Sequence, residues 1–188
     1  MKKTRVFGIT GSHRIGKTTT FDFLKRDIEL RGGISNTERP VFIGEFADCI
    51  LRQMGLREDW EEFAKSKLPY KLFEQALDLL WFSAIIHYEG RIVITDRTPV
   101  DHQAYKKRAG LSVIDNLKSI FTLHNVKVFT FLLRAPWEDK EVAEDILHYL
   151  EENDLEYEQI HLYQGVNFME IAREIEEKIK NKISEREE

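Results

Sequence analysis

The sequence reads Gly11-Ser12-His13-Arg14-Ile15-Gly16-Lys17-Thr18 directly after its first apolar run, which covers Arg5 to Thr10. This octapeptide is a full match to GxxxxGK[ST], and a segment of helical periodicity begins at Lys17. Glycines let a backbone wrap closely around phosphate oxygens, with N–H groups pointing inward and the positive end of a helix behind them. A glycine-containing turn could match the pattern by chance, but the strand before it and the helix after it favour a phosphate-binding loop.

Each polar side chain of this loop has an expected partner on a nucleotide. Lys17 would reach the β- and γ-phosphates, and the Thr18 hydroxyl would be a ligand of Mg²⁺. Thr19, the next residue, could donate a further hydrogen bond on the α-phosphate side. We therefore expect the octapeptide and Thr19 together to bind ATP, with Mg²⁺ as the second cofactor.

A second metal-binding residue is expected at the end of another buried strand. The apolar run Arg91 to Thr95 is followed by Asp96, which is the position of the acid that holds Mg²⁺, usually through water, in P-loop enzymes. Asp is also a common helix N-cap, so Asp96 could instead start the next helix. The presence of the phosphate loop favours the metal.

Apolar runs of strand length alternate with stretches of helical period, the pattern of a parallel α/β sheet. The expected strands are Arg5 to Thr10, Val41 to Gly44, Arg91 to Thr95, Val126 to Leu133 and Gln159 to Leu162. No linker or internal repeat interrupts this alternation. The prediction is one nucleotide-binding domain over residues 1–188.

Three helices are well marked by their periodicity. The first runs from about Lys17 to Arg31 and stops at a pair of glycines, and the last begins after Asn167, with apolar residues every three or four positions. The stretch Tyr70 to Tyr88 is apolar nearly all round, so we expect it to be the most buried helix.

Composition excludes several classes of protein. Hydrophobic residues make up 42% and charged residues 32% of the 188, which fits a globular chain and not a disordered one. The net charge of −5 argues against broad nucleic-acid binding, and the single Cys49 excludes an intramolecular disulfide framework. The longest apolar run, Leu79 to Ile86, is too short to span a membrane. A cytoplasmic location without a membrane partner is the expectation.

The stretch after the third strand carries a family resemblance. Asp96-Arg97 is followed by Asp101 and by Ala104-Tyr105. With the phosphate loop, this stretch resembles the P-loop nucleoside and nucleoside-monophosphate kinases, thymidylate kinase among them. It is also similar to the small ATPase domains of the nicotinamide-riboside-kinase type. The resemblance implies a three-layer α/β P-loop NTPase fold with a five-stranded parallel sheet in the order 2-3-1-4-5.

The resemblance also implies roles for residues around the acceptor. Arg97 would point at the acceptor's phosphate or hydroxyl, although it could instead pair with Asp101 or Glu45 for structure. Glu45, after the second strand, matches the acid that accepts the proton of an attacking hydroxyl, or it would bind a sugar or base edge if the acceptor is a monophosphate. Arg39 is then an alternative phosphate binder. Asp101 and Tyr105 lie four residues apart and could line the acceptor pocket together or simply pack.

The segment after the fourth strand departs from these kinases. They usually carry two or more arginines there, whereas this chain has Arg134 and Lys140 among many acids. Arg134 could stack on adenine or bridge phosphates as a catalytic group. The deficit fits weak or regulated catalysis, or an arginine from another chain, and the sequence is compatible with a homodimer.

Taken together, the residues predict an ATP- and Mg²⁺-dependent kinase that phosphorylates a nucleoside or a nucleoside monophosphate. Lys17, Arg97, Glu45 and Arg134 would be the catalytic residues, and Thr18 and Asp96 would hold the metal. The alternative is a regulatory nucleotide-binding ATPase with little acceptor chemistry. A polynucleotide 5′-kinase is a third reading, which the short basic run Lys106 to Arg108 would serve.

Overall fold

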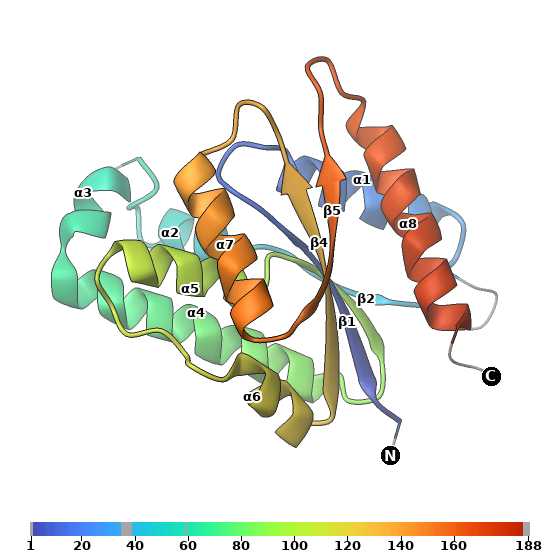
Figure 1. Cartoon of the computed structure of the whole chain (residues 1–188), viewed down its shortest axis with the longest axis horizontal. Helices are drawn as coiled ribbons and strands as arrows, with labels where there is room; N and C mark the ends of the chain where they lie inside the picture. The colour runs from blue at the N-terminus through green and yellow to red at the C-terminus, as the bar shows by residue number, and fades with distance from the viewer. Residues whose placement is uncertain (1, 35–38, 59, 186–188) are drawn as a thin grey trace.

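Five parallel strands form the middle of the molecule in the computed structural model, which describes residues 2–34, 39–58 and 60–185 (Figure 1). Their order in the sheet is β2-β3-β1-β4-β5, as the resemblance implied, and every neighbouring pair is parallel. The bounds are β1 (Thr4–Thr10), β2 (Val41–Ile43), β3 (Ile92–Asp96), β4 (Val126–Arg134) and β5 (Glu156–His161).

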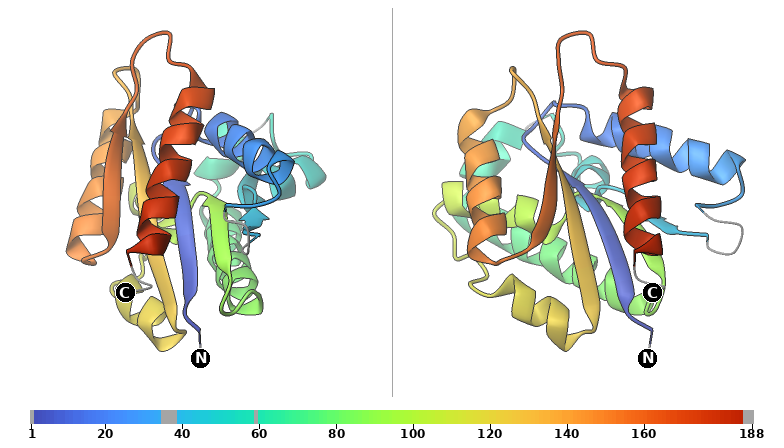
Figure 2. Two further views of the ribbon diagram at one scale, coloured as in Figure 1. Left: turned by 90° about the vertical axis from the view of Figure 1, so that its right-hand side faces the viewer. Right: turned by 45° about the vertical axis from the view of Figure 1, so that its right-hand side comes forward.

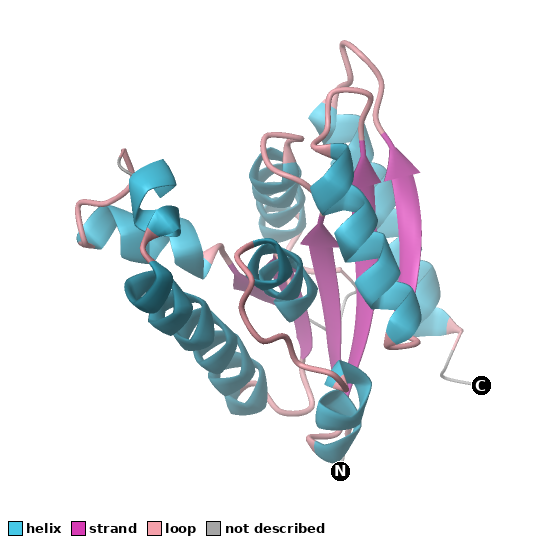
Figure 3. Cartoon of the chain, turned by 60° about the vertical axis from the view of Figure 1, so that its left-hand side comes forward, coloured by secondary structure: helices cyan, strands magenta, loops and turns pink. Residues whose placement is uncertain are grey.

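Helices cover both faces of this sheet and complete a three-layer α/β fold (Figure 2). One face is covered by α1 (Lys17–Leu30) and α8 (Phe168–Ser184). The other face is covered by α4 (Lys67–His87), α5 (Pro99–Arg108), α6 (Leu117–Leu123) and α7 (Lys140–Glu152). Two short helices, α2 (Phe46–Gln53) and α3 (Trp60–Lys65), lie beside α4 and away from most of the strands (Figure 3).

The hydrophobic cores on the two faces of the sheet follow from the alternation of side chains along each strand. In β1, Phe7 and Ile9 are buried against α1 and α8, whereas Val6 is buried with the helices of the opposite face. Central strands covered on both sides must be apolar at nearly every position, which is the pattern that identified them. This packing fixes the carboxyl ends of β1 and β3, where the phosphate loop and Asp96 lie.

Two sequence expectations about elements were inaccurate. β5 begins at Glu156 and not at Gln159, because this edge strand is only partly buried and its polar residues hid its first half. The helix expected over 70–88 is α4, but it is not the most buried one. Its outer face is exposed at Leu72, Leu79 and Ile86, since α4 lies at the outside of its layer.

In the described parts of the chain, no helix is long and apolar enough to cross a membrane.

Candidate functional site

The phosphate loop turns between β1 and α1 on backbone that only glycine tolerates. Gly11 has φ 144° and Gly16 has φ 95°. A Cβ on Gly16 would lie 2.2 Å from the Phe168 ring, and a Cβ on Gly11 would lie 2.8 Å from the Leu133 carbonyl oxygen. Because both positions combine a left-handed backbone with a close neighbour, the loop has a single tight path between β4 and α8.

Lys17 lies beneath this loop. Its Nζ donates to the carbonyl oxygens of Gly11, at 2.8 Å, and of Ser12. Burial, and secondarily the charge of Arg97, lower the pKa of Lys17 to about 7. Lys17 forms no ion pair with a described acid, and a phosphate would supply a partner of opposite charge, so the loop is arranged for an anion.

Asp96 ends β3 next to the loop. Its side chain is buried, and neither carboxylate oxygen has a hydrogen-bond partner of ordinary geometry in the residues that the structure describes. Burial raises the pKa of Asp96 to about 6, while the neighbouring Thr18 hydroxyl and Arg97 act in the opposite direction. A carboxylate whose oxygens lack ordinary hydrogen-bond partners, next to a threonine hydroxyl, provides the oxygen ligands that suit Mg²⁺.

The described residues contain no group of three or more His, Cys, Asp or Glu side chains placed to hold a metal ion. A Mg²⁺ at Thr18 and Asp96 would therefore take most of its ligands from nucleotide phosphates and water, as magnesium usually does.

Arg97 has a strained backbone, with φ 76°, and its N–H donates to the Ile9 carbonyl oxygen at 2.9 Å. Its Nε lies 2.6 Å from Glu45 Oε1, and its Nη1 lies 3.8 Å from Asp101 Oδ1. Burial works against the charge, but the two carboxylates raise the pKa of Arg97 above its ordinary value. The two partners weighed from the sequence are thus both present.

Asp101 and Tyr105 have separate surroundings although they share a helix. Asp101 is fully buried, completes a capping box with Thr98 and accepts a hydrogen bond from the Gly11 N–H at 3.4 Å. Tyr105 faces the site, and its ring centroid lies 4.7 Å from that of His13 in the loop. Asp101 therefore joins α5 to the phosphate loop, and Tyr105 is available to a ligand.

One cavity of about 890 Å³ joins the phosphate loop to the helices α2 to α5. Its volume suits a nucleotide together with a small acceptor. Its lining combines loop residues with charged and aromatic side chains, namely His13, Arg14, Gly16, Lys17, Thr18, Thr19, Glu45, Ala47, Asp48, Leu51, Arg57, Glu58, Glu62, Phe73, Glu74, Leu77, Arg97, His102, Tyr105 and Phe168.

Sequence reasoning missed the wall that α4 contributes. Phe73, Glu74 and Leu77 line the cavity, and none of them belongs to a motif. A signal was present, because Glu74 and Asp78 are acids four residues apart in a largely apolar helix, and both are buried. Buried acids need partners or a function.

Arg134 does not line this cavity. Its guanidinium bonds to Glu138 at 2.9 Å, to Glu144 at 2.7 Å and to Gln159 at 3.4 Å. The segment after β4 instead contacts the loop through its backbone, since the Asp139 N–H donates to Ser12 Oγ. The structure brings Lys17, Thr18, Glu45 and Arg97 together around one cavity and leaves Arg134 bound to acids outside it.

The basic run at the end of α5 is neutralised. Lys106 binds the buried Asp78, Lys107 lies 2.8 Å from Asp145, and Arg108 lies 2.9 Å from Asp139. Such a surface offers little to a polynucleotide.

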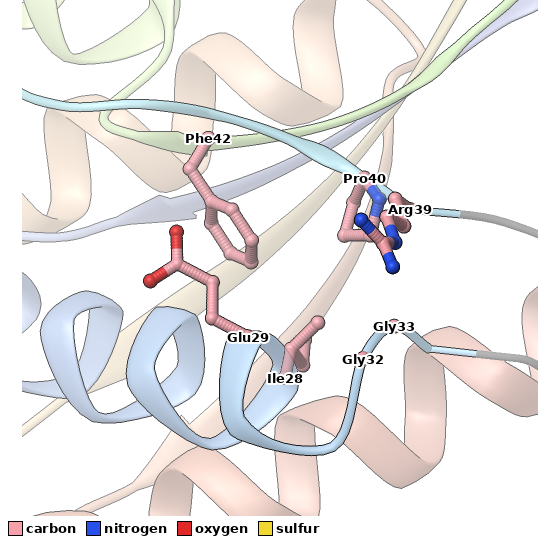
Figure 4. Close-up of a pocket in the computed structure, with 7 residues that line it drawn as sticks. All are labelled: Ile28, Glu29, Gly32, Gly33, Arg39, Pro40 and Phe42. Atoms are coloured by element: carbon pink, nitrogen blue, oxygen red, sulfur yellow. The ribbon is translucent and has the colours of Figure 1, made fainter.

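Arg39, the alternative phosphate binder, lies in a different place. It borders a second cavity of about 320 Å³ between α1 and β2, where it lies beside Pro40 (Figure 4). Arg39 does not line the cavity at the phosphate loop.

No protein-family model and no curated protein matches this sequence. Among the solved structures that match is a crystal structure of thymidylate kinase from Ehrlichia chaffeensis, with a TM-score of 0.57 and 15% sequence identity. The match covers 94% of this chain and 98% of that chain. At this identity the likeness shows the fold, which is that of a P-loop kinase.

Proposed function

We propose that the protein is an ATP- and Mg²⁺-dependent kinase that transfers the γ-phosphoryl group to a nucleoside hydroxyl or to the phosphate of a nucleoside monophosphate. The observation that supports this proposal is the single cavity that joins the phosphate loop to Glu45, Arg97 and Tyr105. An enzyme that only hydrolyses free nucleotide would not need the part of this cavity that extends beyond the phosphate loop. The proposal adopts Lys17, Thr18, Asp96, Arg97 and Glu45 in the roles expected from the sequence.

At the nucleotide end, the loop N–H groups and Lys17 would bind the phosphates. Lys17 would exchange its carbonyl partners for β- and γ-phosphate oxygens, and Arg14, which is exposed on the cavity wall, would add a second cation. Thr18 and Asp96 would hold Mg²⁺, which when bound neutralises part of the phosphate charge. These groups align the triphosphate and lower the electrostatic barrier to transfer.

In the part of the cavity beyond the phosphate loop, Arg97 and Glu45 would position a hydroxyl of the acceptor. The acceptor oxygen forms a bond to the γ-phosphorus while the bond to the β–γ bridging oxygen breaks, which releases ADP. Glu45 would accept the hydroxyl proton, and its ion pair with Arg97 at 2.6 Å fixes the carboxylate toward the cavity. Little covalent chemistry is required of the protein beyond this alignment.

The direct test follows label from γ-labelled ATP to a panel of nucleosides, nucleoside monophosphates and nicotinamide riboside. Lys17→Ala should abolish transfer, whereas Arg97→Ala should reduce kcat/KM for the acceptor by roughly 100-fold or more with a much smaller change in ATP affinity. Equal losses of ATP binding and acceptor use in the Arg97 variant would contradict its assignment. Label found only as inorganic phosphate would contradict the kinase proposal.

One observation favours a second candidate, a regulatory nucleotide-binding ATPase. Arg134 is bound to three partners, so among the described residues the segment after β4 contributes no arginine to the cavity. ATP hydrolysis that rises only when a protein partner is added, with no phosphorylated small product, would support this candidate over the first.

A further inference from the structure

The part of the cavity beyond the phosphate loop, lined from α2 to α5, is rich in carboxylates. We call it the acceptor end; five of its lining residues are acids and two are arginines. Both arginines are already paired, since Arg97 lies 2.6 Å from Glu45 and Arg57 lies 2.9 Å from Asp48. Glu58, Glu62 and Glu74 line the same end and form no ion pair with a described cation.

Glu74 is the most unusual of these acids. It is only 3% exposed, and it receives a hydrogen bond from the Tyr70 hydroxyl. Its Oε2 is buried and has no hydrogen-bond partner among the side chains and backbone that the structure describes. A buried acceptor atom without a partner is destabilising, so its retention calls for an explanation.

Asp78, one turn further along α4, shows what a purely structural acid looks like in this helix. Its carboxylate is bonded to His102 Nδ1 at 3.0 Å, to Gln103 Nε2 at 3.1 Å and to Lys106. Its oxygens are fully used within the protein. Glu74 lies on the same helical face with comparable burial and also lines the cavity, but its Oε2 has no hydrogen-bond partner among the described residues.

Burial raises the pKa of Glu74 above its ordinary value, against the opposing effects of His102 and Tyr70. A ligand that donates a hydrogen bond, or that carries positive charge, would satisfy this carboxyl group. A ligand with a dianionic phosphate would bring further negative charge to an end where the arginines are already neutralised.

Resting on the proposed phosphoryl transfer, we propose that Glu74 Oε2 recognises the acceptor by accepting a hydrogen bond from it, and that the acceptor is an uncharged or cationic nucleoside and not a nucleoside monophosphate. Phe73 and Leu77 also line the cavity from α4 and offer apolar contact to a base. Glu74 is a specificity-determining residue in this scheme, distinct from the groups that bind phosphate.

The test measures binding separately from catalysis. The full chain is saturated with Mg²⁺ and a non-hydrolysable ATP analogue and titrated calorimetrically with adenosine, guanosine, cytidine, uridine, thymidine and nicotinamide riboside, each beside its 5′-monophosphate. At least one nucleoside should bind at least ~10-fold more tightly than its monophosphate, and Glu74→Leu, which removes the acceptor oxygens, should weaken that binding by roughly 10- to 100-fold. Tighter binding of the monophosphates, or of no member of the panel, overturns the inference.

Two controls separate recognition from folding. Glu177→Gln removes an exposed carboxylate from α8, outside the cavity, and should leave acceptor binding unchanged. Glu74→Leu should retain ATP affinity and unfold at an equal or higher temperature than the parent, since it removes a buried acid. A lower melting temperature together with unchanged acceptor affinity would indicate a structural role and overturn the inference. Nucleoside binding without transfer of label would reject the proposed function and leave the recognition by Glu74 standing.

Discussion

Arg97 occupies the left-handed region of backbone space, where residues other than glycine are strained. Its φ of 76° follows directly on Asp96, so the chain turns sharply between the proposed metal ligand and the proposed acceptor ligand. The strain is offset by the backbone hydrogen bond to Ile9 and by the ion pair with Glu45. Strained residues held by over-determined surroundings are typical of functional sites. The position of the guanidinium is therefore fixed before any ligand arrives.

At the residue scale, Gly16 gives the sharpest prediction. Gly16→Ala should lower the free energy of unfolding by about 2–4 kcal/mol and weaken ATP binding, because the new methyl group meets the Phe168 ring as well as a left-handed backbone. Chemical denaturation and nucleotide titration measure both effects.

The matched control is Gly32→Ala. Gly32 also has positive φ, at 80°, but a Cβ there would meet nothing within 4 Å. It should show the backbone strain alone, about 1 kcal/mol, with ATP affinity unchanged. Equal effects of the two substitutions would show that Phe168 does not restrict the loop.

At the scale of elements, α1 and α8 are joined across their packed faces by Glu176. Arg31, which directly follows α1, and Lys180 from α8 both bind this carboxylate, the latter at 2.7 Å. Burial alone would raise the pKa of Glu176, but the two cations lower it below its ordinary value. The same pair of helices flanks the phosphate loop, since α1 begins at Lys17 and Phe168 begins α8.

Glu176→Gln should lower the free energy of unfolding by only about 1 kcal/mol at pH 7.5, because solvent screens the charge of the half-exposed Arg31. Because the folded pKa is depressed, the stabilisation is present above the unfolded pKa and is lost as pH falls through the folded pKa. Thermal melts at pH 7.5, 5.5 and 3.5 should therefore converge for parent and variant at low pH. A deficit that stays constant with pH would mean that packing, and not charge, is what the substitution removes.

Helices and strands could be predicted from the sequence where local rules determine them. Their burial could not be predicted where it depends on tertiary packing. The strand, loop and helix around Gly11 to Lys17 follow from apolar runs and glycines alone. α4 was correctly identified as a helix, but its exposed Leu72 and Leu79 could not be foreseen, because periodicity does not reveal which helices lie at the outside.

At the scale of the whole molecule, the sheet order came from the resemblance, since no local pattern encodes which strands pair. The same limit applies to the site. Arg134 binds Glu144 and Gln159, which become its neighbours only when β4, α7 and β5 assemble. Glu74 reaches the cavity only because α4 and α5 pack together at the carboxyl edge of the sheet.

Ligand linkage gives a test of the intact molecule. Saturating ATP with Mg²⁺, at about 100 times its Kd, should stabilise the fold by about 2.7 kcal/mol and raise Tm by roughly 5–10 °C. Asp96→Asn should remove the part of this shift that depends on Mg²⁺ and keep the part due to ATP. Differential scanning fluorimetry with and without EDTA measures it, and a parent shift that EDTA does not change would argue against a metal at Asp96.

The pairing of β1 has a consequence for synthesis. β1 is the first strand of the chain and lies at the centre of the sheet, between β3 and β4, with Thr4 opposite Val126 and Thr10 opposite Leu132. On the ribosome, the segment that carries the phosphate loop therefore emerges long before its partner strands, since β4 begins 116 residues after β1 ends. Until then the apolar β1 has open edges that are prone to aggregation, so we expect nucleotide binding to wait until β4 has emerged and paired.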